Sequence, residues 1–235
     1  MESDLNRSEK ALCIIPARGG SKRIPGKNVK LFHGKPIIAY SIETALESEL
    51  FSEVMVSTDD AEIARIARNF GATVPFLRSE VNSNDFATTL DVIEEVKSNY
   101  KKLGQVFADI CCLYATAPLV TPQRIRQGFD LLKSCNVSFA MTAFSYPVWR
   151  GLKRKDDKSM EFAWPEYKNS RSQDLPPIFH DAGQWYWFKN SDLSNGIFGA
   201  HCKGLELTAI EVQDIDTLDD WQIAELKYAY LHDSR

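Results

Sequence analysis

Apolar positions along the chain follow two alternating patterns, short continuous runs and runs with a spacing of three or four residues. Residues 11–15 form the first continuous run, which ends at Pro16 and predicts a buried strand. From Pro36 the apolar positions recur with helical spacing, and a proline suits the first turn of a helix. The chain therefore opens with a strand, a polar loop and a helix.

The same two patterns continue to the end of the chain. Further strands are predicted at residues 54–56, 73–76, 106–114, 137–144, 184–188 and 207–212, and further helices at residues 63–70, 88–100, about 125–132 and 217–231. Strands that alternate with helices predict an α/β fold, a doubly wound and mostly parallel sheet with helices on both faces. Ligands bind such sheets beyond the carboxyl ends of the strands, so the loops that follow strands are the places to look for a site.

The alternation breaks between about residues 145 and 181. This segment carries isolated large apolar residues, Trp149, Phe162 and Trp164, and a highly charged turn at residues 153–158. Because the segment is too small for a core of its own, we expect an inserted dimerisation arm that packs on a second subunit. The alternative is a loop folded back on its own domain. We expect residues 1–235 to form one domain, with a polar tail at residues 1–10.

Composition narrows the class of protein. Lys and Arg number 28 against 32 Asp and Glu, and this net charge of −4 argues against a nucleic-acid-binding protein. No apolar run reaches the roughly 20 residues that span a bilayer, and the first ten residues are unlike a signal peptide. The five cysteines lack C-x-x-C or zinc-site spacing, which predicts reduced thiols. We expect a cytoplasmic protein with no membrane or nucleic-acid partner.

The loop after the first strand, residues 16–30, is the strongest local signal. Its five basic residues, with no acidic one beside them, are Arg18, Lys22, Arg23, Lys27 and Lys30. Glycines let backbone N–H groups approach an anion, and Arg18 and Lys27 can neutralise phosphate oxygens, so the loop is predicted to hold a polyphosphate. A solvated basic turn is the alternative. The loop is not a kinase-type phosphate loop, because five residues separate Gly20 from Gly26, and it lacks the G-x-G-x-x-G motif.

Three other groups of residues could serve a site or the fold. Asp214 and Asp216 stand two residues apart, so in an extended segment both carboxylates lie on one face, as hard oxygen ligands of Mg²⁺. An ordinary pair of surface carboxylates is the alternative. Asp59 or Asp60 follows a strand, and a helix cap is the favoured explanation. Thr88, at the start of a predicted helix, fits either a cap or a nucleotide contact.

Five motifs follow one another from residue 11 to the end of the chain. They read IIPARGGSKRIPGKN with GKPIIAYSI, then VSTDD, VPFLR, ATAP and DID. This series resembles the CMP-sialic acid synthetase family of cytidylyltransferases. The resemblance implies a Rossmann-like, nucleotide-diphospho-sugar transferase-like fold and a homodimer. It also implies an enzyme that joins CMP from CTP to a nine-carbon acidic sugar (a nonulosonic acid), releases pyrophosphate and uses Mg²⁺.

The resemblance assigns roles to individual residues. The residues expected to bind the nucleotide are Arg18, Gly19, Ser21, Lys22, Lys27, Asn28 and Thr88. Asp214 and Asp216 would hold the metal, and the catalytic candidates are Arg18, Lys27 and Asp216. Arg18 and Lys27 suit the departing pyrophosphate, because phosphoryl-type transfer depends on positioning and charge neutralisation. No general base is evident, so the proton could pass to a metal-bound hydroxide, to His180 or to solvent.

The sugar-reading residues point to one branch of the family. Tyr114 stands before ATAP, where many relatives have a glutamine, and a phenol cannot replace both groups of an amide. The stretches RSQDL from Arg171 and FHDAGQWYW from residue 179 are most similar to the branch that activates pseudaminic acid. Arg171 could pair with the sugar carboxylate, while Gln173 and His180 could contact the sugar. Structural roles for Arg171 and His180, N-acetylneuraminate or legionaminate as substrate, and a non-catalytic binding module are the alternatives.

Overall fold

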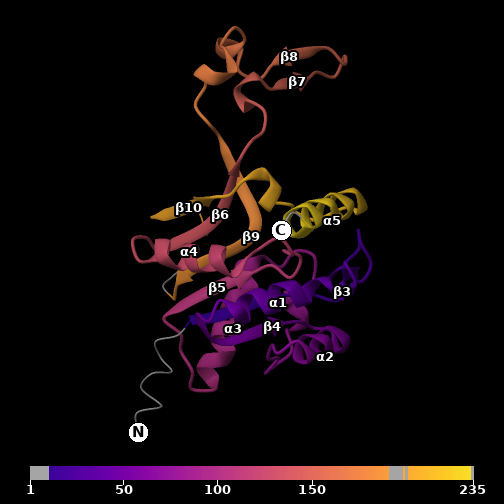
Figure 1. Ribbon diagram of the computed structural model, residues 1–235, viewed down its shortest axis with the longest axis vertical. Helices are drawn as coiled ribbons and strands as arrows, with labels where there is room; N and C mark the ends of the chain where they lie inside the picture. The colour runs from indigo at the N-terminus through magenta and orange to yellow at the C-terminus, as the bar shows by residue number, and fades with distance from the viewer. Residues whose placement is uncertain (1–10, 191–197, 199–200, 234–235) are drawn as a thin grey trace.

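The computed structural model describes residues 11–190, 198 and 201–233. The predicted tail at residues 1–10 lies outside this range. A six-stranded sheet with the order β10-β6-β9-β5-β1-β4 forms the centre of the molecule (Figure 1). Its strands are β1 (Ala11–Pro16), β4 (Phe51–Ser57), β5 (Asp109–Leu113), β6 (Val137–Ala143), β9 (Phe179–Lys189) and β10 (Cys202–Glu206). β9 runs antiparallel to β5 and β6, while the other neighbouring pairs are parallel. The prediction of a mostly parallel sheet is confirmed.

Helices cover both faces of the sheet, as the α/β pattern predicts. They are α1 (Ile37–Glu47), α2 (Ala61–Asn69), α3 (Thr89–Lys102), α4 (Pro122–Leu132) and α5 (Leu218–Asp233). Cys13 and Ile15 of β1 pack with α1, α2 and α4 on one face. Leu12 and Ile14 pack with α3 on the other face, because side chains alternate along a strand. The doubly wound arrangement is therefore confirmed. None of the described helices is long and apolar enough to cross a bilayer.

A small third cluster joins the end of the chain to the loop after β1. The hairpin of β2 (Leu31–Phe32) and β3 (Lys35–Pro36) buries Phe32 against Trp221 of α5. The rings of these two residues meet edge to face at 5.6 Å. Ile215, which lies just before α5, belongs to the same cluster and is fully buried. The paired aspartates are thereby held close to the basic loop.

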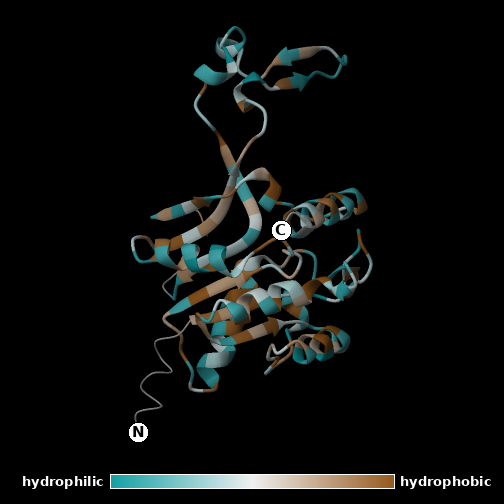
Figure 2. Ribbon diagram, in the orientation of Figure 1, coloured by the Kyte–Doolittle hydropathy of each residue, from teal (hydrophilic) through white to brown (hydrophobic). Residues whose placement is uncertain are grey.

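An arm stands away from the body on the segment that joins β6 to β9 (Figure 1). It contains the hairpin of β7 (Leu152–Arg154) and β8 (Met160–Phe162). None of residues 144–178, all of which the structure describes, is buried. Trp149 fastens the arm internally, because its ring lies 5.7 Å from Trp164 and its Nε1 donates a hydrogen bond to the carbonyl of Pro176 at 2.9 Å. Figure 2 shows that the hydrophobic positions concentrate in the body, whereas the arm is mixed.

Short 3-10 helices complete the chain, and two of the predicted strands are wrong. They are η1 (Lys27–Val29), η2 (Glu80–Asn82), η3 (Val148–Arg150), η4 (Pro165–Tyr167), η5 (Ser172–Asp174) and η6 (Ala209–Glu211). Residues 73–76 do not form a strand, since Thr73 makes a single isolated bridge to Met55. Residues 207–212 are not a strand either. Thr208 and Glu211 form a capping box for η6, and the strand lies earlier, at β10.

Candidate active site

The basic loop leaves β1 at the carboxyl edge of the sheet and folds around its own backbone. Asn28 is buried, and its Nδ2 donates a hydrogen bond to the carbonyl of Arg18 at 2.9 Å. Gly26 begins η1 with φ at 62°, a left-handed conformation that glycine adopts without strain. The predicted nucleotide residue Asn28 therefore also shapes the loop that carries Arg18.

Gly19 lies directly against the loop after β4. Its N–H donates a hydrogen bond to Oδ1 of Asp59 at 3.0 Å. A Cβ atom at Gly19 would lie 2.7 Å from Oδ2 of Asp60, so no larger side chain fits without a shift. Asp60 caps α2 by accepting hydrogen bonds from the N–H groups of Glu62 and Ile63, which confirms the cap that the sequence favours.

Each cation of the basic loop has a partner in the structure. Arg18 pairs with Asp85 at 2.7 Å, and Lys22 pairs with the other oxygen of the same carboxylate. The remaining contacts run to the end of the chain: Arg23 to Asp216 at 2.8 Å, Lys27 to Asp216 at 3.5 Å, Lys27 to the Ile215 carbonyl at 2.7 Å, and Lys30 over the Trp221 ring at 4.7 Å. The predicted phosphate loop and the predicted metal ligands are therefore brought together.

Asp214 and Asp216 line a cavity of about 450 Å³ at this edge of the sheet. Burial and the charge of Asp216 raise the pKa of Asp214 above its ordinary value. Asp220 fixes the segment, because its carboxylate accepts hydrogen bonds from the N–H groups of Asp216 at 3.1 Å and Thr217 at 2.8 Å. The two aspartates are thus crowded carboxylates on an ordered backbone.

The same carboxylate pair suits a magnesium ion. Within the described part of the chain, no group of three or more His, Cys, Asp or Glu side chains is arranged to hold a metal. Mg²⁺ commonly takes one or two protein carboxylates and completes its shell with substrate phosphates and water. Two neighbouring carboxylates, of which Asp214 has a pKa raised by burial and by the charge of Asp216, match that donor set.

His180 and Asp181, at the start of β9, line the cavity as well. Asp181 accepts hydrogen bonds from the Tyr186 hydroxyl and from the N–H of Gly183, the latter at 3.0 Å. A Cβ atom at Gly183 would lie 3.5 Å from the Asp214 carboxyl carbon, so this turn abuts the predicted metal ligands. Sequence reasoning missed Asp181, although it adjoins His180 in a stretch already singled out.

Tyr114 follows β5 and lies behind this turn. Its hydroxyl is 3.1 Å from that of Thr89, and its ring centre is 5.5 Å from the ring of Tyr186. Burial raises the pKa of both tyrosines, so both phenols stay protonated at neutral pH. Thr88 caps α3 through a reciprocal capping box with Asp91, so the predicted cap is confirmed and its nucleotide contact stays a prediction.

The predicted sugar residues of the arm are separated by the structure. Gln173 lines a hollow of about 370 Å³ at the base of the arm, which shares Ala143 and Ser145 with the cavity of Asp214. Arg171 lines neither space. It pairs with Asp174 at 2.8 Å on the exposed surface of the arm, the structural alternative that the sequence left open.

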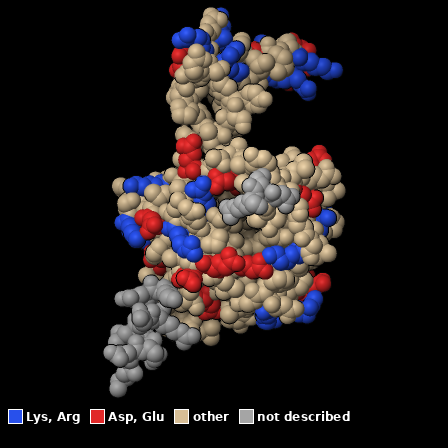
Figure 3. Space-filling view, in the orientation of Figure 1, with Lys and Arg blue, Asp and Glu red and all other residues tan. Residues whose placement is uncertain are grey.

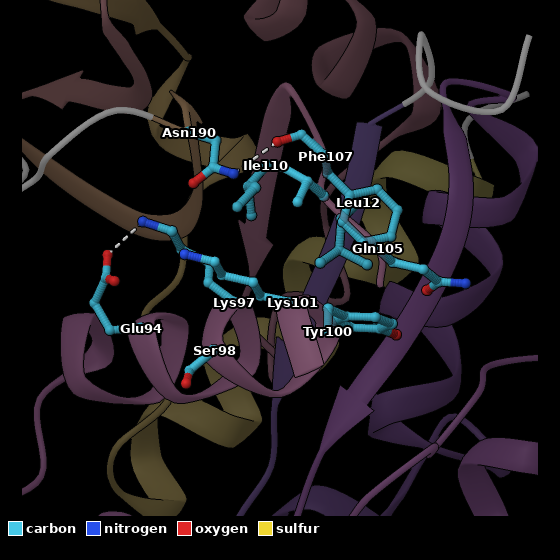
Figure 4. Close-up of a pocket in the computed structure, with 11 residues that line it drawn as sticks. Leu12, Glu94, Lys97, Ser98, Tyr100, Lys101, Gln105, Phe107, Ile110 and Asn190 are labelled. Carbon is cyan, nitrogen blue, oxygen red and sulfur yellow. Dashed lines mark hydrogen bonds and ion pairs between the residues drawn. The ribbon is translucent and has the colours of Figure 1, made fainter. Parts of the chain in front are cut away.

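A cavity of about 440 Å³ at the opposite edge of the sheet lacks this chemistry (Figure 4). It lies between α3 and the amino end of β5, where Tyr100 and Phe107 form apolar walls and Lys97 pairs with Glu94. None of the predicted site residues lines it. The candidate active site is therefore the cavity at the carboxyl edge.

A basic loop after the first strand, facing paired carboxylates at the carboxyl edge of an α/β sheet, defines a nucleotidyltransferase. The chain belongs to the cytidylyltransferase family, whose profile matches residues 12–163. It is 39% identical over 229 residues to a pseudaminic acid cytidylyltransferase of Campylobacter jejuni. This match covers 96% of this chain and 99% of that protein. It is 33% identical to the CMP-N,N'-diacetyllegionaminic acid synthase of Legionella pneumophila, over 91% of this chain and 94% of that protein.

A solved structure shares the fold. The structure of CMP:2-keto-3-deoxy-manno-octonic acid synthetase complexed with CTP superposes with a TM-score of 0.69. The match covers 95% of this chain and 100% of that chain at 20% identity. The sheet and its helices therefore share the fold of a synthetase whose structure was solved in complex with CTP.

Proposed function

We propose that this cytidylyltransferase joins CMP from CTP to pseudaminic acid and releases pyrophosphate. The observation that carries the proposal is the meeting of Lys27 with Asp216, because we assign Lys27 to the phosphates of CTP and Asp216 to the metal. The likeness to the Campylobacter jejuni enzyme over nearly the whole chain supports pseudaminic acid as the sugar. A closely related sugar such as legionaminate is the second candidate, because the Legionella pneumophila enzyme is also similar.

The chemistry is an in-line displacement at the α-phosphorus of CTP. The anomeric oxygen of the sugar forms a bond to that phosphorus while the bond to the bridging oxygen breaks, and pyrophosphate leaves with that oxygen and its electron pair. Arg18 and Lys27 neutralise the triphosphate and the leaving group, and Asn28 holds the loop that presents them. Gly19, Ser21, Lys22 and Thr88 complete the proposed nucleotide site.

The proton of the sugar hydroxyl passes to His180 in this proposal. Nδ1 of His180 lies 2.9 Å from the carbonyl oxygen of Asp181. Because a carbonyl can only accept a hydrogen bond, Nδ1 carries the hydrogen, and Nε2 of the neutral ring is the acceptor. The ring lines the same cavity as Asp214 and Asp216.

Asp214 and Asp216 are the proposed ligands of Mg²⁺, which when bound screens phosphate charge and polarises the phosphoryl group. Asp216 is shared with Arg23 and Lys27. These two cations orient the carboxylate toward the basic loop.

The sugar lies, in our proposal, between the paired aspartates and the base of the arm. Gln173 lines the hollow at the base of the arm, Tyr114 would act from behind Tyr186, and Arg171 would supply a cation for the sugar carboxylate. Arg171 lies on the arm, outside the cavity of its own chain, so we propose a homodimer in which the arm packs on the second subunit. One face of the hairpin presents Leu152, Met160 and Phe162 beside Arg154, and Leu152 and Met160 are each 54% exposed.

The test is pyrophosphate release from CTP and Mg²⁺ with pseudaminic acid, legionaminate and N-acetylneuraminate compared side by side. We expect the highest kcat/KM with pseudaminic acid. A higher value with another sugar would keep the chemistry and reject the proposed substrate. Binding of CTP without release of pyrophosphate from any of them would support a binding module instead.

A further inference from the structure

One carboxylate from a distant part of the chain forms ion pairs with two cations of the basic loop. Asp85 lies in the segment between η2 and α3, 67 residues from Arg18. One of its oxygens accepts a hydrogen bond from Nη1 of Arg18 at 2.7 Å, and the other accepts from Nζ of Lys22. The arrangement is that of an anion bound by the loop, with the anion supplied by the protein.

The segment that carries Asp85 is built to present it. Oδ1 of Asn84 accepts hydrogen bonds from the N–H groups of Phe86 at 2.7 Å and Ala87 at 3.0 Å, which closes a turn around Asp85. Thr88 then anchors the turn to the start of α3. The tip itself is not packed on the body, since Phe86 is 92% exposed. Asp85 can therefore leave its partners without disturbing the core.

Asp85 and a phosphate group compete for the same donors. Hydrogen bonds from Lys22 and Arg18 hold the pKa of Asp85 below its ordinary value, so it is charged at neutral pH. A carboxylate oxygen and a phosphate oxygen accept the same charge-assisted hydrogen bonds from Arg and Lys. Exposed ion pairs of this kind are weak, because solvent screens them. A triphosphate, with more charge and more oxygens, can displace the single carboxylate.

Lys27 behaves differently and gives the contrast. Its side chain is 21% exposed, against 78% for Lys22, and it is bonded to the backbone carbonyl of Ile215 at 2.7 Å. A contact with a buried backbone does not compete with an incoming anion. The exchange with Asp85 is therefore limited to Arg18 and Lys22, the two cations that it contacts.

We infer that Asp85 is an internal placeholder for the triphosphate: it holds Arg18 and Lys22 in the free enzyme, is displaced by CTP, and so sets the affinity for CTP. The inference rests on the proposed function, because it takes the basic loop as the triphosphate site. Asp85 is thereby a residue that opposes nucleotide binding, whereas the residues of the basic loop assigned to the nucleotide favour nucleotide binding.

The experiment compares wild type with Asp85→Asn by calorimetric titration with CTP and with inorganic tripolyphosphate, both without magnesium. The placeholder predicts that both ligands bind the variant roughly three- to tenfold more tightly, because two weak ion pairs no longer oppose them. The KM for CTP should fall by a similar factor, and the KM for the sugar should not change. Asp130→Asn is the charge-matched control, because Asp130 pairs with Lys133 on α4.

Each other result contradicts the inference. Weaker binding by Asp85→Asn would mean that Asp85 arranges the two cations for the ligand, and equal binding would mean that the ion pairs have no bearing on it. Asp85→Ala, which leaves no acceptor, must agree in direction with Asp85→Asn. If wild type binds no CTP and releases no pyrophosphate, the proposed function fails. If wild type binds CTP and the variant is not tighter, only the role of Asp85 fails.

Discussion

The candidate site of the body and the arm differ in where the partners of their charged residues come from. In the body, Lys27 and Asp216 come from segments 189 positions apart in number and meet at 3.5 Å beside a buried isoleucine. On the arm, Arg171 meets only Asp174, three residues away and in solvent. On the face seen in Figure 3, charges of both signs are spread over the arm and the body alike. Charge alone therefore does not mark a site; convergence of distant segments at a strand edge does.

The largest expected effect is that of Asp216→Asn, which tests the site in the body. We expect kcat to fall by roughly a thousandfold, because the metal supplies several kcal/mol of transition-state stabilisation. Steady-state pyrophosphate release measures the loss, and circular dichroism checks the fold. The control is Asp219→Asn, which removes the same charge in the first turn of α5. Near-normal turnover by the Asp216 variant would reject the metal assignment.

The arm is tested by placing charge on the apolar face of its hairpin. Leu152→Asp with Met160→Asp should weaken dimerisation by roughly a hundredfold, because unpaired charges are costly to bury in an interface. Analytical ultracentrifugation over a range of concentrations measures the dissociation constant. Lys153→Glu is the control, since Lys153 lies opposite Glu161 in the strand register, on the other face of the hairpin. A monomeric wild type, or a dimer unaffected by both changes, would remove the arm from the interface.

The smallest of these three effects is expected at Arg171, where a variant tests whether the residue serves the sugar or only its ion pair on the arm. Arg171→Ala should raise the KM for the sugar roughly tenfold and leave the KM for CTP unchanged, because it loses a bidentate partner of the sugar carboxylate. Asp174→Ala is the matched variant, since it removes the other member of the ion pair. If Arg171 serves only that ion pair, the two variants should behave alike. A raised sugar KM in the Arg171 variant alone would assign it to the substrate.

Local signals predicted much of the fold and singled out the basic loop and the paired aspartates, which the structure brings together. The apolar run at residues 11–15 and the cap at Asp60 depend on neighbours in sequence, and both are confirmed. The strand expected at residues 73–76 is wrong because a β-ladder needs a partner along its length, and only Thr73 finds one. The pairing of Asp85 with Arg18 could not be predicted, because no local pattern links positions so far apart.

The direction of β9 has a consequence for how the protein can diverge. Because β9 is antiparallel to β6, the two ends of the arm are fixed side by side by hydrogen bonds such as those that align Thr142 with His180. Once the ends of a connection are fixed, doubling its length costs only about 0.6 kcal/mol of loop-closure free energy. The arm can therefore gain or lose residues at a small cost in stability, while the sheet below it keeps its register.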